Sequence, residues 1–288
     1  MTKELNIAVS SICFSGKSPE EIINIAKKEN YILEFSSGMP FRKDMEEIYL
    51  NAPLKKIPHN YFPAPEKPFV INLASSDDEI RVRSVAHCVN GLRLASLGKA
   101  PFFSAHAGFC VDPNPSELGR QLKQVDKLDK KKNWTLFIDS VKQVLAKAEK
   151  YNVDFLIENN VIAPMNIYKD GTNPLFCCDD AEMVKLISEI HDHRLGILLD
   201  TGHIKVSSNT LKFSLEKSLS EIKTFIKAIH HSDNDGIFDT NDPLKEKYWF
   251  WNYIKEFSDL YHVLEVKNQT VEQINFQLML IKNHINTQ

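Results

Sequence analysis

The chain has 288 residues, of which 43% are hydrophobic and 25% charged, a composition typical of a folded globular protein. Its formal net charge is −3, so no surplus of cationic residues points to a nucleic acid or an acidic membrane as its partner. The start of the sequence lacks a basic segment followed by a long apolar run, and no apolar stretch approaches about 18 residues, so we expect neither a signal peptide nor a membrane span. The five cysteines are odd in number and irregularly spaced, which favours a reducing, cytoplasmic location.

Short β-rich apolar runs alternate with longer amphipathic stretches along the chain. In chain order, the expected strands are residues 5–14, 31–37, 102–109, 153–160, 195–203, 225–233 and 261–268. The expected helices are residues 18–30, 77–98, 134–152, 180–193, 211–225 and 270–285. An eighth strand is expected between residues 55 and 75, where IPH (57–59) and FVINLAS (69–75) both fit.

This repeated alternation is typical of parallel strands joined by crossover helices. No G-x-G-x-x-G turn follows the first expected strand, which disfavours a dinucleotide-binding sheet. About eight strand–helix units in a chain of this length predict an α/β protein with the (β/α)8 fold, a TIM barrel. No linker or change of composition divides the sequence, so we expect a single domain over residues 1–288.

Acidic and imidazole side chains recur where the expected strands end. They are Glu34, His59, His106, Glu158, Asp200, His203, His230, His231, Asp233 and Glu265. Any one of them alone is more often a surface or paired residue, but in a barrel all these strand ends meet at the face that carries active sites. Carboxylates that converge there with an imidazole are a typical ligand set for a divalent ion, because unpaired buried charge is costly. His230 and His231 are neighbours on one strand, so only one can face the site, and alternation alone does not say which.

Four motifs in a fixed order resemble the xylose isomerase-like TIM barrels. They are ENN (158–160), LLDTGH (198–203), HHSDNDG (230–236) and VLEVK (263–267). This family includes sugar-phosphate isomerases and epimerases, ketose 3-epimerases and the apurinic endonucleases of the endonuclease IV type. The resemblance extends over essentially the whole chain and implies a metal site made by Glu158, Asp200, His230 and Glu265. It also implies that His231 points to the helix layer.

By this resemblance the protein would be a metal-dependent isomerase or epimerase of a sugar or sugar derivative, with one divalent ion (Mn, Mg, Co or Zn). Glu158 and Glu265 would also be the acid–base pair, which moves a proton next to a carbonyl that the ion chelates. Substrate-binding roles would fall to His59, His106, His203, Lys267 and Asp233. Lys267 shares the strand parity of Glu265, so its ammonium group could face inward and meet a phosphate or carboxylate.

Other functions stay open: a zinc-dependent abasic-site endonuclease, a related metal-dependent lyase, dehydratase or hydrolase, and a sugar-binding barrel without chemistry. His59 and His106 stand at two histidine positions of the endonuclease, but its later Asp-x-His pair falls on Asp239-Thr240-Asn241, and an amide is a poor zinc ligand. We expect a small sugar as the partner, and neither nucleic acid nor membrane. The aromatic run 248–251 fits core packing, a subunit contact in a homo-oligomer, or a cover over the site.

Overall fold

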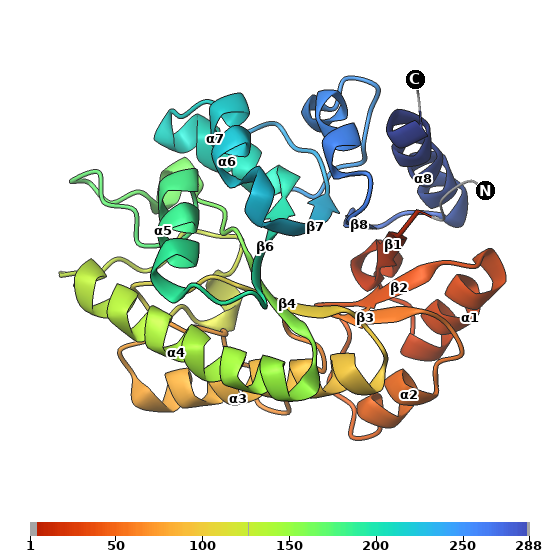
Figure 1. Cartoon of the computed structure of the whole chain (residues 1–288), viewed down its shortest axis with the longest axis horizontal. Helices are drawn as coiled ribbons and strands as arrows, with labels where there is room; N and C mark the ends of the chain where they lie inside the picture. Colours follow the sequence, from red (N-terminus) through yellow and green to blue (C-terminus); the bar gives the residue numbers. More distant parts are fainter. Residues whose placement is uncertain (1–4, 126, 287–288) are drawn as a thin grey trace.

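Eight parallel strands form the centre of the molecule (Figure 1). The structure, a computed structural model, describes residues 5–125 and 127–286. The strands are β1 (Ile7–Ser10), β2 (Ile32–Phe35), β3 (Lys56–Pro58), β4 (Phe102–His106), β5 (Asp154–Glu158), β6 (Leu195–Asp200), β7 (Ile226–His231) and β8 (Tyr261–Leu264). They pair in the order β3-β2-β1-β8-β7-β6-β5-β4. His59, just after β3, pairs in parallel with Ser104 of β4, so the two end strands meet and the barrel is nearly closed. The predicted TIM-barrel fold is confirmed.

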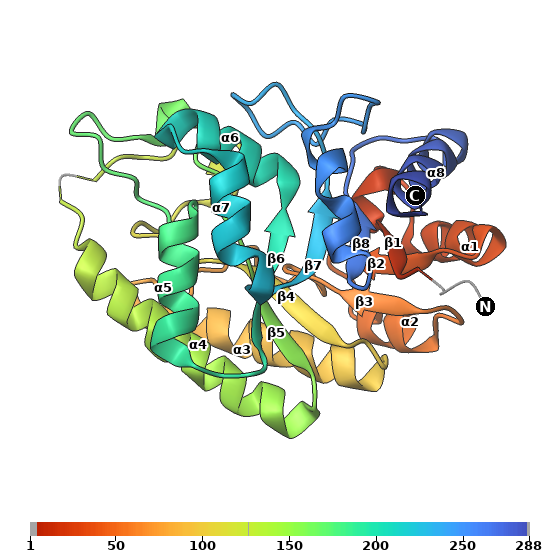
Figure 2. The same cartoon turned by 45° about the horizontal axis from the view of Figure 1, so that its top comes forward.

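Helices surround the strands on the outside of the barrel (Figure 1). They are α1 (Pro19–Glu29), α2 (Met45–Asn51), α3 (Asp78–Leu97), α4 (Lys130–Tyr151), α5 (Asp180–Ile190), α6 (Thr201–Leu211), α7 (Leu215–Ile222) and α8 (Val271–Asn286). In Figure 2 the arrows of β6 and β7 point toward the face from which the long loop after β7 projects. Among the described residues, no helix is long and apolar enough to cross a membrane.

The structure selects one of the two candidate segments for the third strand. IPH lies in and directly after β3, whereas residues 69–75 form a loop outside the sheet. Within this loop the side chain of Asn72 donates hydrogen bonds to the carbonyl oxygens of Phe109 (3.1 Å) and Val111 (3.0 Å). This loop is therefore tied to the loop that follows β4 without joining a strand ladder, and Val70 packs with Phe109 and Val111 while Ile71 and Leu73 belong to the main core.

Two helices, α2 and α6, were not predicted, and several predicted strands were too long: the expected strand 5–14, for example, ends at Ser10 and is followed by a 3-10 helix (Ser11–Phe14). The expected strand 195–203 ends at Asp200 because the carboxylate of Asp200 accepts a hydrogen bond from the backbone nitrogen of His203 (2.7 Å) and begins α6. The motif DTGH is thus a strand end and a helix start at once.

The aromatic run packs in the core of the protein and does not cover the site. Most of the run lies in a 3-10 helix (Trp249–Asn252), which belongs to the segment that joins β7 to β8, where the structure has no α-helix. Tyr248, Phe250 and Trp251 are buried. The ring of Trp251 stacks on His284 of α8 with a centroid distance of 4.2 Å.

Gly91 of α3 allows this helix to lie directly on β4. A Cβ atom at this position would lie 2.3 Å from the ring of Phe103, a fully buried residue of β4. Alanine normally stabilises a helix by about 1 kcal/mol relative to glycine, but overpacking costs about 1–3 kcal/mol. We therefore expect Gly91→Ala to lower the free energy of unfolding, measured by urea denaturation. The loss should shrink in a Phe103→Leu background, and an equal loss in both backgrounds would contradict this packing argument.

Candidate metal centre and active site

A cavity of about 410 Å³ opens at the carboxyl end of the strands, the face of a TIM barrel that carries active sites. Six of the site residues predicted from the sequence line it: His59, His106, Glu158, His203, Glu265 and Lys267. They come from the ends of β3, β4, β5 and β8 and from the first turn of α6. Residues far apart in the sequence therefore meet at one cavity.

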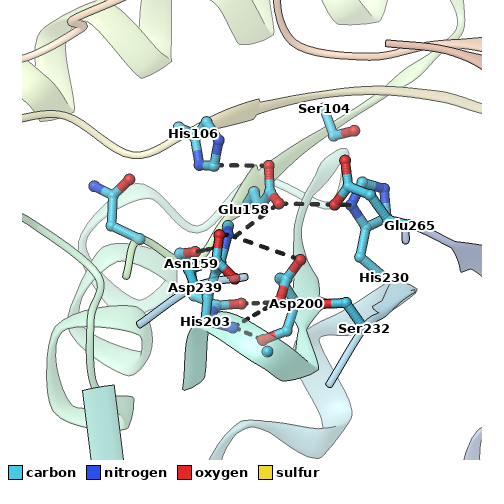
Figure 3. A network of polar contacts seen from close by, with 12 residues as sticks. Ser104, His106, Glu158, Asn159, Asp200, His203, His230, Ser232, Asp239 and Glu265 are labelled. Atoms are coloured by element: carbon cyan, nitrogen blue, oxygen red, sulfur yellow. Dashed lines mark hydrogen bonds and ion pairs between the residues drawn. The ribbon is translucent and has the colours of Figure 1, made fainter. Parts of the chain in front are cut away.

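Four buried side chains converge beside this cavity, as the sequence predicted. Glu158, Asp200, His230 and Glu265 each offer one atom to a cluster in which all four atoms lie within 4.8 Å of one another. They stand at the end of β5, β6 and β7 and directly after β8. Figure 3 shows Glu158 pointing between His106 and His230, with Asp200 nearby. The cluster is compact enough for one cation to contact all four residues.

Two buried carboxylate oxygens of these residues make no hydrogen bond within the described part of the protein. Oδ1 of Asp200 accepts the hydrogen bond from the His203 nitrogen, while its Oδ2 is buried and makes no hydrogen bond. Oε2 of Glu158 is also buried without a hydrogen bond, and the ring nitrogens of His59 and His106 lie 3.3 and 3.4 Å from it. A buried oxygen left without a donor or cation is costly. Three carboxylates and one imidazole are a donor set that suits a divalent ion, so the residues present fit such an ion.

The pKa shifts of the cluster residues indicate an excess of negative charge in the cluster. Burial raises the pKa of Asp200 to about 8, and the nearby carboxylates of Glu265 and Glu158 add to this rise. Burial would lower the pKa of His230, but Glu34 and Glu265 raise it well above its ordinary value. The cluster therefore favours a positive charge at its centre, which a divalent ion would supply.

A second group of side chains meets on the other side of Glu158. Its Oε2 lies 3.3 Å from Nε2 of His59 and 3.4 Å from Nδ1 of His106. Burial would raise the pKa of Glu158, but His106 and His59 hold it well below its ordinary range. The Nδ1 atom of His59 is held by the hydroxyl of Ser104 at 2.8 Å. His106, Glu158 and His203 each offer an atom within 4.8 Å of the others, so these three residues form a second candidate site for a cation.

Asn159 fixes His203 and the end of β6. Nδ1 of His203 donates to the Asn159 carbonyl oxygen (2.9 Å), which leaves Nε2 facing Asp239 Oδ2 at 3.3 Å. The side chain of Asn159 accepts from the backbone nitrogen of Asp200 (2.7 Å) and donates to its carbonyl oxygen (3.2 Å). Sequence reasoning gave Asn159 no role, although its place in the motif ENN was a signal. Asn241 lines the cavity together with Asp239.

The structure also answers which of the two adjacent histidines faces the cluster. His230 does so, whereas the ring of His231 is buried on the other side of the strand. Nδ1 of His231 lies 3.1 Å from the hydroxyl of Tyr248, and its Nε2 lies 2.9 Å from Nδ1 of His262. The expectation that His231 points away from the site, toward the helix layer, is confirmed.

Asp233 lies apart from the cavity, in contrast to the expectation that it binds substrate. Its carboxylate accepts a hydrogen bond from the ammonium group of Lys205 (2.6 Å), and its backbone pairs with Asp242. This pairing fixes the loop after β7, so we assign Asp233 a structural role.

Lys267, in contrast, lines the cavity together with Arg120. No sequence signal pointed to Arg120, which belongs to the loop between β4 and α4.

The fold and this site together define a (β/α)8 barrel with a buried carboxylate–histidine cluster at its active face. The model of the xylose isomerase-like TIM barrel family matches residues 40–257, and the chain belongs to this family. The resemblance seen in the four motifs is thereby confirmed. No curated protein matches the chain by sequence.

Solved structures of sugar epimerases share the fold over nearly the full length. A D-tagatose 3-epimerase-like protein is 15% identical, with a TM-score of 0.71 over 98% of this chain and 97% of its own. D-psicose 3-epimerase from Clostridium cellulolyticum H10 is 15% identical, with a TM-score of 0.68 over 98% of each chain. The 3-keto-D-glucoside 4-epimerase from E. coli is 11% identical, with a TM-score of 0.67 over 97% of this chain and 100% of its own. At these identities the similarity establishes the fold.

Proposed function

We propose that the protein is a divalent-metal-dependent isomerase or epimerase of a sugar or sugar derivative. The observation that carries the proposal is the placement of Glu158 and Glu265, which both line the cavity and both belong to the four-residue cluster. They arrive from β5 and β8, which are separated in the barrel by β6 and β7, so they approach a bound substrate from different sides. The epimerase names of similar structures support the same reaction class.

The chemistry requires a proton to leave and return at a carbon next to a carbonyl group. One of Glu158 and Glu265 removes this proton, and the other delivers a proton or stabilises the opposite face. When bound, the ion supplies a fixed positive charge that stabilises the negative charge developing on the carbonyl oxygen. His203, whose Nδ1–H is held by Asn159, presents its other nitrogen to a substrate hydroxyl.

The test is proton exchange with solvent. The metal-loaded protein is incubated in D₂O with a panel of ketoses, and ¹H NMR follows loss of the signal at the carbon next to the carbonyl. We expect exchange and interconversion for at least one sugar. Neutral and phosphorylated forms of each ketose are compared, because Lys267 at the cavity can pair with a phosphate. A sugar that stabilises the protein without any exchange would contradict the enzyme and favour a sugar-binding barrel.

A second candidate function is zinc-dependent hydrolysis of a phosphate ester, as in an abasic-site endonuclease. It is favoured by His106, Glu158 and His203, which lie close enough together to provide ligands for a second ion, and by His59, which lies 3.3 Å from Glu158. Asn241 and the acidic net charge weigh against it. Two or three zinc ions per chain, together with chelator-sensitive nicking of an abasic duplex, would establish it. No nicking at high protein concentration would exclude it.

A further inference from the structure

Glu34 of β2 is a fully buried carboxylate for which the reaction above has no use. Its Oε2 accepts a hydrogen bond from Nε2 of His230 at 2.9 Å. On the other edge of the same ring, Nδ1 of His230 lies 2.9 Å from Glu265 Oε2 and 3.5 Å from Glu158 Oε1. The imidazole of His230 therefore stands between Glu34 and the remaining members of the cluster.

The two edges of the His230 ring have different tasks. A histidine that binds a cation offers a lone pair from one nitrogen and keeps its proton on the other. The carboxylate of Glu34 accepts an N–H, which holds the proton on Nε2. The lone pair of Nδ1 is then directed toward Glu158 and Glu265, where the ion would be bound.

We propose that Glu34 is a positioning residue that fixes the tautomer and the orientation of His230 for the binding of a divalent ion. This inference rests on the proposed metal dependence. Carboxylates that accept the second N–H of a metal-binding histidine also make the imidazole a stronger donor. Glu34 therefore raises the affinity of the site for the ion without contacting it.

The surroundings of Glu34 make it a rigid support. Its position in β2 is fixed by pairing with Ser10 of β1 and Ile57 of β3. The ring of His59 packs edge-on against His230, with a centroid distance of 4.7 Å, and restricts rotation of the imidazole. Because Glu34 Oε2 contacts the edge of the ring that faces away from Glu265, Glu34 acts through His230.

The test measures the affinity and stoichiometry of Zn²⁺ by competition with a chromophoric chelator. We compare the wild type with Glu34→Gln and Glu34→Leu. Loss of a carboxylate that supports a metal-binding histidine weakens metal affinity by about 10–100-fold, and we expect this for Glu34→Leu with unchanged stoichiometry. Glu34→Gln should lose less, because its amide oxygen still accepts the Nε2–H of His230. Asp233→Asn is the matched control, since it removes one negative charge near the same face and should leave the affinity unchanged.

A spectroscopic measurement separates positioning from general support of the fold. Long-range ¹H–¹⁵N NMR of the Zn²⁺-loaded wild type should show His230 protonated at Nε2 only, and Glu34→Gln should keep this tautomer. Wild-type affinity in Glu34→Leu, or a proton on Nδ1 of His230, would overturn the role of Glu34. A lower stoichiometry in both variants would identify it as a ligand instead. A wild type that binds no ion would overturn the metal dependence itself and this role with it.

Discussion

Replacing Glu265 by glutamine is expected to abolish interconversion of the sugar substrate while the protein stays folded. Glutamine has the same shape but cannot take up a proton, and loss of a general base typically costs about 10²–10⁴-fold in rate. Glu265 lies directly after β8, where its backbone nitrogen donates to the His231 carbonyl oxygen (3.0 Å), so the strand pairing does not depend on the carboxylate. The rate is measured by ¹H NMR at saturating metal.

The companion variant Glu158→Gln tests whether the two glutamates act on opposite faces of the substrate. If the two glutamates serve opposite faces of the substrate, each variant should lose exchange with D₂O from one epimer and keep it from the other, in a complementary pattern. Glu256→Gln, an exposed glutamate paired with Lys223, is the matched control and should retain the wild-type rate. Interconversion by Glu265→Gln at a wild-type rate would remove Glu265 from the mechanism.

The sequence predicted the barrel and the meeting of four distant residues because both depend on a repeating pattern. Parallel strands that alternate with helices bring all their carboxyl ends to one face, so Glu158, Asp200, His230 and Glu265 could be placed together without coordinates. Strand alternation left the choice between His230 and His231 open, and only the family motif resolved it. The limits of this reasoning lay in short elements such as α2, which has seven residues and too little periodicity to stand out.

Contacts between side chains of different strands could not be predicted from the sequence. Glu34 was visible at the end of a strand, but its hydrogen bond to His230 joins residues 196 positions apart and depends on the tilt and register of the barrel. The same holds for Asn159, which supports Asp200 across two neighbouring strands. Asp233 shows the opposite case: a motif position suggested the site, but Lys205 of α6 takes up its charge.

Replacing Asp200 by asparagine is expected to remove the bound ion while leaving the helix start intact. One oxygen of Asp200 accepts from the His203 nitrogen and begins α6, and asparagine can still do this. The other oxygen, which is buried and has no hydrogen-bond partner, would become an NH₂ group that directs protons at the ion. Elemental analysis of the protein purified without added metal should show about one Mn, Co, Mg or Zn per chain in the wild type, and none in the variant.

Thermal unfolding adds a second readout that separates metal loss from damage to the fold. A ligand at 100 times its dissociation constant stabilises a protein by about 2.7 kcal/mol, so added metal should stabilise the wild type and have no effect on Asp200→Asn. Without metal, the variant should be at least as stable as the wild type, because it lacks one of three carboxylates buried together. Asp77→Asn makes the same change at the start of α3, outside the cluster, and should keep the ion. Full metal content in Asp200→Asn would mean that the four-residue cluster is not the metal site.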